Sequence, residues 1–173
     1  MLPIEILIED YNIQNLNSDN LKDVYQLIVS DKTNLNVIGH ENNYDFDFEK
    51  LHERYVETLI NTFEYFCGIF YSKELIGIIK GRLENKNNLE NWFLTYILKD
   101  TFRNKGIGSI LLNSFEEHIS INFGVERFFA VISSENKQSK NFWIKNGYKF
   151  ERESYYLKIN NKPAQIYYKY KKE

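Results

Sequence analysis

RNKGIG, residues Arg103 to Gly108, joins two segments of different periodicity. The residues before it, 91–98, form an apolar run that is typical of a buried strand. After it, apolar side chains recur at helical spacing to about residue 123. A glycine-rich turn between a strand and a helix leaves backbone N–H groups free and lets an anion approach the backbone closely. The stretch therefore predicts a turn that holds a pyrophosphate.

The six residues alone leave a second interpretation open. Neither the G-x-x-x-x-G-K-[ST] motif nor the G-x-G-x-x-G motif is present, and a lone G-x-G also occurs where a turn needs glycine only for its geometry. A later stretch, NKQSKNFWIKNGYKF from Asn136 to Phe150, favours the pyrophosphate-binding interpretation. Asn136 is a good residue to begin a helix, and Gly147 is a good residue to end it.

Together the two stretches resemble the GNAT superfamily of N-acetyltransferases. That family carries an R-x-x-G-x-G/A turn after a strand, followed by an N-x-x-[AS] helix that ends in [FY]-[YW]-x-x-x-G-[FY]. The resemblance is sharp from about residue 75 to 150 and weak before residue 65. The positions that fit are Arg103, Gly106, Gly108, Asn136, Ser139, Gly147 and Tyr148.

The resemblance implies an enzyme, an acetyl-CoA-dependent acyltransferase of the N-acetyltransferase type. It would move the acetyl group from acetyl-CoA to a primary amine by direct transfer in a ternary complex, with acetyl-CoA as co-substrate and no metal. The acceptor would be a small-molecule amine or an amine of a protein or peptide. A non-catalytic acyl-CoA-binding or regulatory module with the same fold is the alternative.

Length and composition indicate the number of domains and argue against several other classes of protein. A chain of 173 residues suits one domain, 1–173, with room for a core. Its net charge of −2, without a basic run, argues against nucleic acid as a partner. No apolar stretch suits a membrane span, and the N-terminus lacks the pattern of a signal peptide. The single cysteine, Cys67, lies in an apolar run and suits a reducing cytoplasm. The abundance of Lys, Asn and Ile suggests a bacterial, AT-rich genome.

The pattern of elements predicts an α/β (α+β) fold in the order βααβββαβαββ. We expect a mixed, mostly antiparallel sheet of about seven strands with helices on both faces. The expected strands are residues 4–9, 65–71, 75–84, 91–98, 127–133, 148–159 and 164–170.

Local signals also predict where the helices begin and what lies between them. Asn20 is a candidate cap for the first helix, and Asp45 or Asp47 for the second. Residues 31–44 are polar and predict a long loop. The side chains expected on the buried face of the second helix are Phe48, Leu51, Tyr55, Leu59 and Phe63.

For CoA, the resemblance adds the end of strand 91–98 to the glycine-rich turn. In relatives a bulge there splays two parallel strands, so that pantetheine pairs with the exposed backbone. Asn136 can cap its helix with its side-chain oxygen and donate its amide N–H to pantetheine. The predicted contacts of CoA are Ile97, Leu98, Lys99, Arg103, Asn104, Lys105, Gly106, Ile107, Gly108, Ser109, Asn136, Ser139 and Trp143.

The catalytic groups depart from the family pattern. Many relatives have a tyrosine at the position of Trp143, whose indole N–H is not an acid at neutral pH. Trp143 would donate a hydrogen bond to sulfur or wall the tunnel, or it is simply a core side chain. Ser139 and Tyr148 are the hydroxyl groups nearby in sequence. The nearest carboxylates for a base are Glu84 and Glu90, which also suit solvated strand ends.

The resemblance points to two segments for the acceptor. One is the connection between the first two helices, and the other is the last hairpin, where relatives often dimerise, so that a homodimer is a further expectation. Acidic and aromatic side chains in both suit a cationic amine, although solvated loop charges would look the same. These side chains are His40, Glu41, Tyr44, Asp45, Asp47, Glu151, Glu153, Tyr155 and Tyr156.

Overall fold

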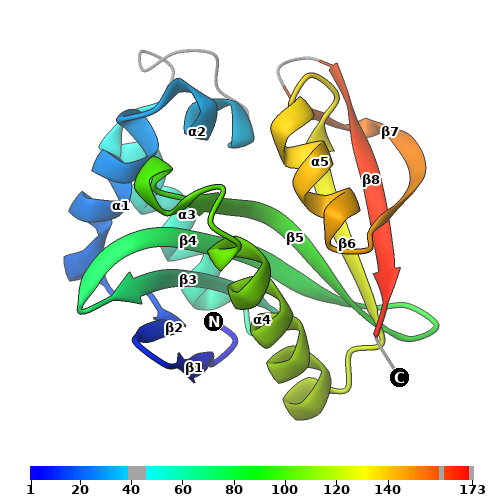
Figure 1. The fold of residues 1–173 in the computed structure, drawn as a ribbon, viewed down its shortest axis with the longest axis horizontal. Coiled ribbons are helices and arrows are strands. Elements are labelled where there is room, and N and C mark those ends of the chain that lie inside the picture. Colours follow the sequence, from blue (N-terminus) through cyan, green and yellow to red (C-terminus); the bar gives the residue numbers. More distant parts are fainter. Residues whose placement is uncertain (39–45, 160–161, 172–173) are drawn as a thin grey trace.

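The computed structural model describes residues 1–38, 46–159 and 162–171. In this part of the chain, eight strands form one sheet in the order β1-β2-β3-β4-β5-β6-β8-β7, and only β5 and β6 run parallel (Figure 1). The strands are β1 (Glu5–Ile8), β2 (Tyr11–Asn15), β3 (Glu64–Tyr71), β4 (Glu74–Asn85), β5 (Leu89–Leu98), β6 (Arg127–Ser133), β7 (Lys149–Ile159) and β8 (Lys162–Tyr170).

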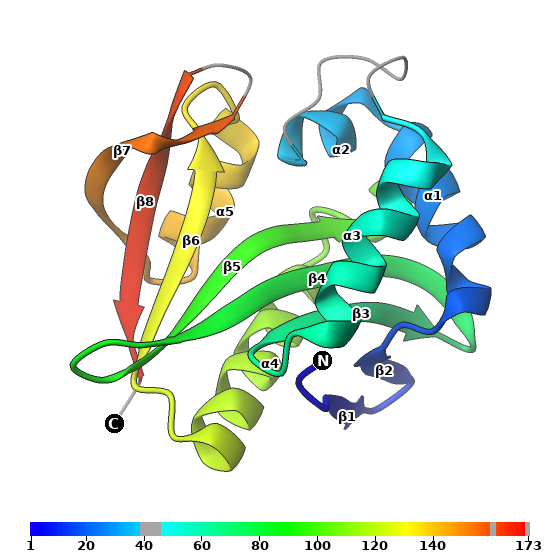
Figure 2. The same cartoon turned by 180° about the vertical axis from the view of Figure 1, so that it is seen from behind.

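Helices cover both faces of this sheet. The helices are α1 (Leu21–Val29), α2 (Lys32–Val37), α3 (Phe48–Ile60), α4 (Ile107–Phe123) and α5 (Lys137–Lys145). Successive side chains of a strand point to opposite faces, so Cys67 packs in the core under α4 while Phe66 packs in the core under α1 and α3. Figure 2 shows α1 and α3 on the face opposite to α4.

The predicted fold class is confirmed, with one strand more than expected. The first strand ends after Ile8 and turns back into β2, which pairs along β3. The turn between them places Glu9 at a φ of 50°, a left-handed conformation that glycine usually adopts. Since no glycine marks this turn, the sequence gives little warning of the hairpin.

The prediction of a loop over 31–44 is wrong for its first part, which forms α2. Asp31 begins this helix, and its side chain accepts a hydrogen bond from the Thr33 backbone N–H at 2.8 Å. Leu35 anchors the helix in the core with 2% exposure. A single buried leucine in a polar stretch is too short a pattern to predict a helix from periodicity.

The helix starts are partly as predicted. The Asp47 side chain caps α3 by accepting from the Lys50 backbone N–H at 2.9 Å, whereas the alternative cap, Asp45, lies outside the described residues. Asn20 makes no capping bond to α1; instead Asn17 caps the short 3₁₀ turn before it.

The predicted apolar face of α3 is only half right. Leu51 and Tyr55 are buried, whereas Phe48 and Leu59 are 39% and 43% exposed. Phe63 lies beyond the last residue of the helix, Ile60, and is exposed too. Helical spacing alone did not mark where α3 ends.

The parallel strands β5 and β6 diverge, as the resemblance implied. Residues 90–93 pair with residues 127–130, and no pairing joins the two strands beyond them in the described chain. In β5, Leu94 is the extra residue of a bulge, because Phe93 lies opposite Gly81 and Thr95 lies opposite Lys80. The last residues of β5 therefore turn one backbone edge toward a space that no strand fills.

Candidate active site

The glycine-rich turn presents a row of free backbone donors. Asn104 and Gly106 have φ values of 59° and 81°, and Gly106 begins α4 without a capping side chain. In the described chain, the backbone N–H groups of residues 104–108 have no hydrogen-bond acceptor, whereas that of Arg103 donates to Asp100 O at 3.0 Å. Successive free N–H groups at a helix N-terminus form a concave site for an anion.

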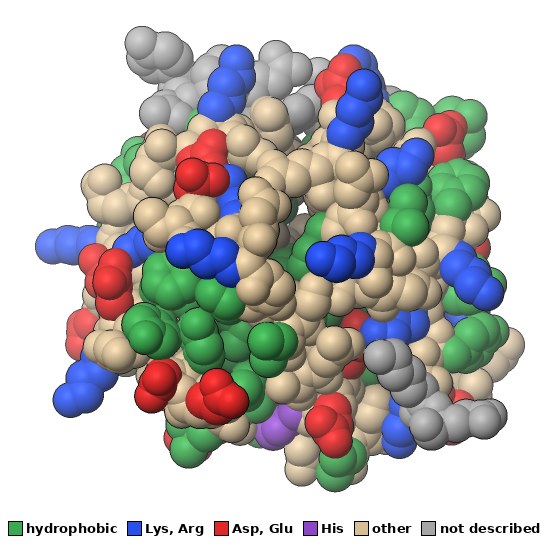
Figure 3. Space-filling model, in the orientation of Figure 1, with side chains coloured by type: hydrophobic (Ala, Val, Ile, Leu, Met, Phe, Trp, Pro, Cys, Tyr) green, Lys and Arg blue, Asp and Glu red, His purple; other side chains and the backbone are tan. Residues whose placement is uncertain are grey.

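A cavity of about 410 Å³ opens beside this turn. The turn, the end of β5, α5 and α2 each contribute to its lining. Figure 3 shows the face that carries α4 and α5, with basic side chains on both sides of a central hollow. The lining residues are Thr33, Asn34, Val37, Tyr96, Ile97, Leu98, Arg103, Asn104, Gly106, Gly108, Ser109, Asn136, Gln138, Ser139, Asn141, Phe142, Trp143 and Lys145.

Most of the residues predicted to contact CoA meet at this cavity. Ile97 and Leu98 line it from β5, at the edge that turns away from β6. Lys99 does not line it, because its backbone N–H donates to Ile76 O at 2.7 Å and its ammonium group pairs with Glu74. Lys105 and Ile107 are also absent from the lining, although their backbone N–H groups belong to the free row.

Asn136 has the position that the sequence predicted for it. Its side-chain oxygen accepts a hydrogen bond from the Ser139 backbone N–H at 2.9 Å, which caps α5. Asn136 and Ser139 both line the cavity. The cap uses the amide oxygen, so the amide N–H₂ group remains available as a donor.

Trp143 is buried, and it is one of the residues that line the cavity. It is 4% exposed and packs against Phe93, Tyr96, Phe142 and Tyr148, with centroid distances between 4.7 and 6.1 Å. Tyr148 does not line the cavity. Its hydroxyl group donates to Glu116 Oε1 at 2.7 Å, and burial raises its pKa.

Tyr96 is a site residue that the sequence interpretation did not single out. Its hydroxyl group donates to the Gly108 carbonyl oxygen at 2.7 Å, and its ring stacks on Phe142 at 5.3 Å. Burial raises the pKa of Tyr96, so the phenol stays protonated. The bulge at Leu94 shifts the alternation of β5 by one residue, so Tyr96 lies on the same face as Phe93, under α4. Simple alternation along the sequence would have placed it on the opposite face.

Glu84 and Glu90 lie far from the cavity, which corrects the prediction that either serves as the base. They face each other at the hairpin end of β4 and β5. Glu90 is seven residues before Ile97, about 20 Å along the strand. Burial alone would raise the pKa of Glu84, but hydrogen bonds from Lys86 and Arg82 lower it below its usual range.

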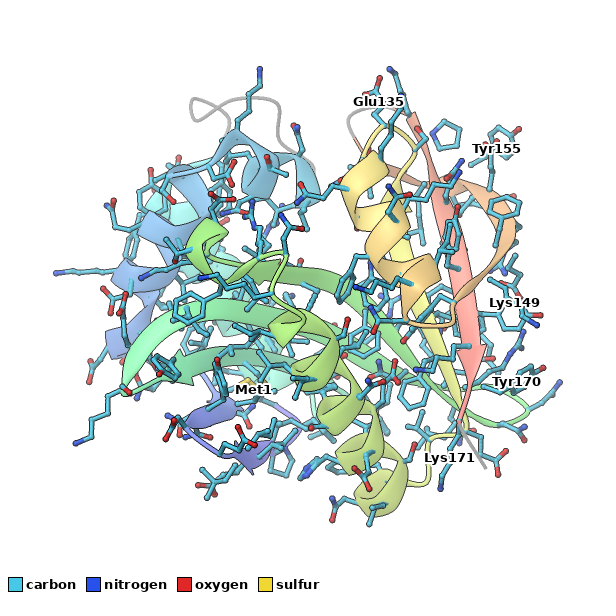
Figure 4. The ribbon with its side chains drawn as sticks, viewed as in Figure 1. Met1, Glu135, Lys149, Tyr155, Tyr170 and Lys171 are labelled. Atoms are coloured by element: carbon cyan, nitrogen blue, oxygen red, sulfur yellow. The ribbon has the colours of Figure 1, made fainter. Side chains whose placement is uncertain are left out.

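Of the two predicted acceptor segments, the connection between the first two predicted helices reaches the described cavity through α2, whereas the last hairpin does not line it. His40, Glu41, Tyr44 and Asp45 lie outside the described residues. In the last hairpin, the Glu151 carboxylate pairs with Arg127 at 3.0 Å. Tyr155, labelled in Figure 4, is 71% exposed on the outer side of β7. Glu153 and Tyr156 do not line the cavity either. The residues that the connection supplies are Thr33, Asn34 and Val37 of α2, and none of them was among the side chains named for the acceptor.

Two further classes of site find no support in the described chain. Among residues 1–38, 46–159 and 162–171, no group of three or more His, Cys, Asp or Glu side chains is arranged to hold a metal ion. Within the same ranges, none of the helices has the length and apolar character that crossing a membrane requires.

Comparison with known proteins identifies the family of this architecture. Residues 21–148 match the model of the acetyltransferase (GNAT) family. No curated protein sequence matches the chain.

Solved structures share the fold at low sequence identity. The ribosomal L7/L12 alpha-N-protein acetyltransferase RimL, in complex with coenzyme A, has a TM-score of 0.78 at 16% identity, with 96% of this chain and 98% of that chain covered. The microcin C7 self-immunity acetyltransferase MccE, in complex with acetyl-CoA and AMP, has a TM-score of 0.77 at 18% identity over 94% and 93%. Spermidine N-acetyltransferase from Vibrio cholerae, in complex with CoA and spermine, has a TM-score of 0.74 at 15% identity over 94% and 96%.

Proposed function

Because the chain belongs to the GNAT acetyltransferase family, we propose that it transfers an acetyl group from acetyl-CoA to a primary amine by direct transfer in a ternary complex. The observation that carries this proposal is one cavity that joins a row of free backbone N–H groups to the open edge of β5. The first suits a pyrophosphate and the second suits the amides of pantetheine. We take residues 1–173 as one acetyltransferase domain.

Each part of the cavity has a role in this proposal. The backbone N–H groups of residues 104–108 bind the pyrophosphate, helped by the positive end of the α4 dipole. Ile97 and Leu98 present backbone groups to pantetheine, and Asn136 donates its amide N–H. This brings the thioester to the space between β5 and β6, where an amine attacks its carbonyl carbon.

In this proposal, neither deprotonation of the amine nor departure of the thiolate requires a described side chain as base or acid. None of the described lining residues is a carboxylate or a histidine, so we propose that the incoming amine loses its proton to water. Trp143 packs beside the thioester as part of the cavity wall and does not act as an acid. The thiolate leaves without a protein acid because a thiol has a pKa of only about 8.5.

The acceptor is an amine of a small molecule or of a protein. Fold relatives act on both kinds, since RimL is named for the ribosomal protein L7/L12 and another relative for spermidine. This range supports the amine as the shared chemistry and leaves the size of the acceptor open.

Titration calorimetry with CoA tests the binding step. Gly106→Ala strains the turn, because a residue with a side chain is disfavoured at a φ of 81°, and we expect CoA to bind about tenfold more weakly. Gly124, at the other end of α4, is the matched control. It has a φ of 74°, and like Gly106 it has open space where a Cβ would lie. Gly124→Ala costs similar stability and should leave CoA affinity unchanged. Absence of saturable CoA binding by the natural chain refutes the proposal.

A second candidate is a module that binds acyl-CoA without transferring the acyl group. The observation that favours it is Trp143, which fills the family's tyrosine position from within an aromatic cluster. Release of free thiol from acetyl-CoA, measured across a panel of polyamines, amino acids and peptides, separates the two candidates. Amine-dependent release supports the enzyme, and tight CoA binding without release supports the module.

A further inference from the structure

Arg103 uses its charged group in a way that the sequence motif did not suggest. Each of its three guanidinium nitrogens donates a hydrogen bond to the protein: Nε to Leu98 O at 2.8 Å, Nη1 to Asp31 Oδ2 at 2.8 Å and Nη2 to Asn34 Oδ1 at 2.6 Å. The side chain is 15% exposed. Its charge is thus paired with Asp31, and the Asp100 carboxylate lies 3.7 Å from Nη1.

The partners of Arg103 control the position of α2. Asp31 is the cap of this helix, so one carboxylate joins the helix start with Oδ1 and the guanidinium with Oδ2. Asn34 is 2% exposed, and its Nδ2 donates to Leu27 O at 2.8 Å. Leu98 is the last residue of β5. Arg103 therefore ties α2 to the strand that presents the pantetheine edge, and Asn34 ties α2 to α1.

The helix that Arg103 holds forms a wall of the cavity. Thr33, Asn34 and Val37 line the main cavity, while Lys32, Thr33 and Asn36 line a second hollow beside the start of α5. In Figures 1 and 2, α2 and α5 stand on opposite sides of the diverging ends of β5 and β6. With six residues, α2 is too short to be stable without contacts to the rest of the protein.

We propose that Arg103 is a positioning residue, which fixes α2 as the wall opposite α5 and leaves pyrophosphate binding to the backbone of the turn. The structural part of this proposal stands on the contacts alone. Its consequence for catalysis rests on the proposed acetyl transfer. Loss of the contacts of Arg103 should raise the KM for the amine more than the KM for acetyl-CoA.

Hydrogen–deuterium exchange of the intact protein tests the structural part without any ligand. In Arg103→Gln and in Asp31→Asn, we expect the α2 amides to exchange about tenfold faster or more, because a hydrogen bond to a charged group is lost. The double variant should exchange no faster than either single variant, since both changes remove the same tie. Lys105→Gln is the control, because Lys105 is an exposed basic residue of the same turn and should leave α2 exchange unchanged.

Calorimetry with CoA separates positioning from direct binding. If Arg103 positions α2, Arg103→Gln and Asp31→Asn both change the Kd for CoA by less than about threefold. If Arg103 instead binds the pyrophosphate, Arg103→Gln weakens CoA strongly, while Asp31→Asn frees the guanidinium and does not. That second pattern, with α2 exchange unchanged, overturns the proposal. If the glutamine variant fails to fold, Asp31→Asn alone decides the structural part, because unchanged α2 exchange in that variant would show that the tie does not hold the helix.

Steady-state kinetics with the most active amine of the panel adds a readout that a purely structural role would not produce. We expect Arg103→Gln to raise KM for the amine and to leave KM for acetyl-CoA nearly unchanged, with partial rescue by Arg103→Lys. An equal rise in both constants contradicts the proposal. If CoA binds and no amine is acetylated, the proposed function fails, whereas the exchange and affinity results still decide the role of Arg103.

Discussion

Asn136 caps α5, and the proposed function gives the same side chain a second task, so its two ends can be tested separately. Its oxygen caps α5, and its amide N–H₂ group is free to meet pantetheine in the cavity. The contact with pantetheine is what the family resemblance implied, whereas the sequence predicted the cap, because a cap depends only on neighbours along the chain. The same is true of the left-handed glycines that begin and follow α4. Features decided within a few residues were the easiest to predict.

Substitution of Asn136 should separate the cap from CoA binding. Asn136→Ala removes both, which costs about 1 kcal/mol of stability and weakens CoA. Asn136→Asp keeps a capping oxygen but loses the amide donor, so we expect near-normal stability with weakened CoA binding. Urea unfolding and calorimetry measure the two effects.

Asn17 provides the control for this prediction. Its side-chain oxygen caps the 3₁₀ turn before α1, and it does not line the cavity. Asn17→Ala should lower stability without changing CoA affinity. Normal CoA affinity in Asn136→Asp would remove Asn136 from the binding site.

At the scale of the element, α2 is the part of the site that the sequence interpretation missed. A six-residue helix with one buried leucine gives no clear periodicity. Its stability comes from the contacts of Asp31 and Asn34 with Arg103, which lies 72 and 69 residues further along the chain. By contrast α4 and α5 were predicted well, because each carries start and stop signals of its own. The bulge in β5 came from the family resemblance and not from any local signal.

The anchoring of α2 should depend on pH through Asp31. Burial works to raise the pKa of this carboxyl, but hydrogen bonds from Thr33 and Arg103 outweigh it and bring the pKa below its ordinary value of 3.8. Folding therefore favours the charged form. The stabilisation is complete above about pH 5 and is lost as the pH falls below 3.8 through the folded pKa.

Amide exchange of α2, corrected for the intrinsic rate at each pH, measures this dependence. We expect protection of residues 32–37 to fall with the acid transition of Asp31 before the central strands open. Asp31→Asn should show low protection at every pH and no such step. An identical pH profile in the variant would show that another group controls the helix.

At the scale of the whole molecule, a buried ion pair joins α4 to β8, two elements that are far apart in the sequence. Lys169 of β8 pairs with Glu116 of α4, and both side chains are less than 10% exposed. Tyr148 donates to the same carboxylate. This cluster connects the strands that follow α5 to the helix that follows the glycine-rich turn, so it fixes α4 against the sheet.

Removal of one partner should be costly, because it leaves a buried charge uncompensated. We expect Lys169→Met to lower the free energy of unfolding by about 3–5 kcal/mol. The double variant Lys169→Met/Glu116→Gln removes both charges and should recover much of that loss. Urea denaturation of the single and double variants gives the coupling, and additive losses would show that the two residues act independently.

The sequence by itself determined the class of fold, the strand–turn–helix that offers an anion site and the capped helix α5, because each depends on periodicity or on residues close in the chain. The tertiary structure alone decided which groups meet at the cavity. It brought α2 to the end of β5 and paired the Arg103 guanidinium with Asp31. It placed Glu84 and Glu90 at the hairpin end of β4 and β5, away from the cavity. These outcomes depend on long-range packing and on competition between charged partners, which no local pattern records.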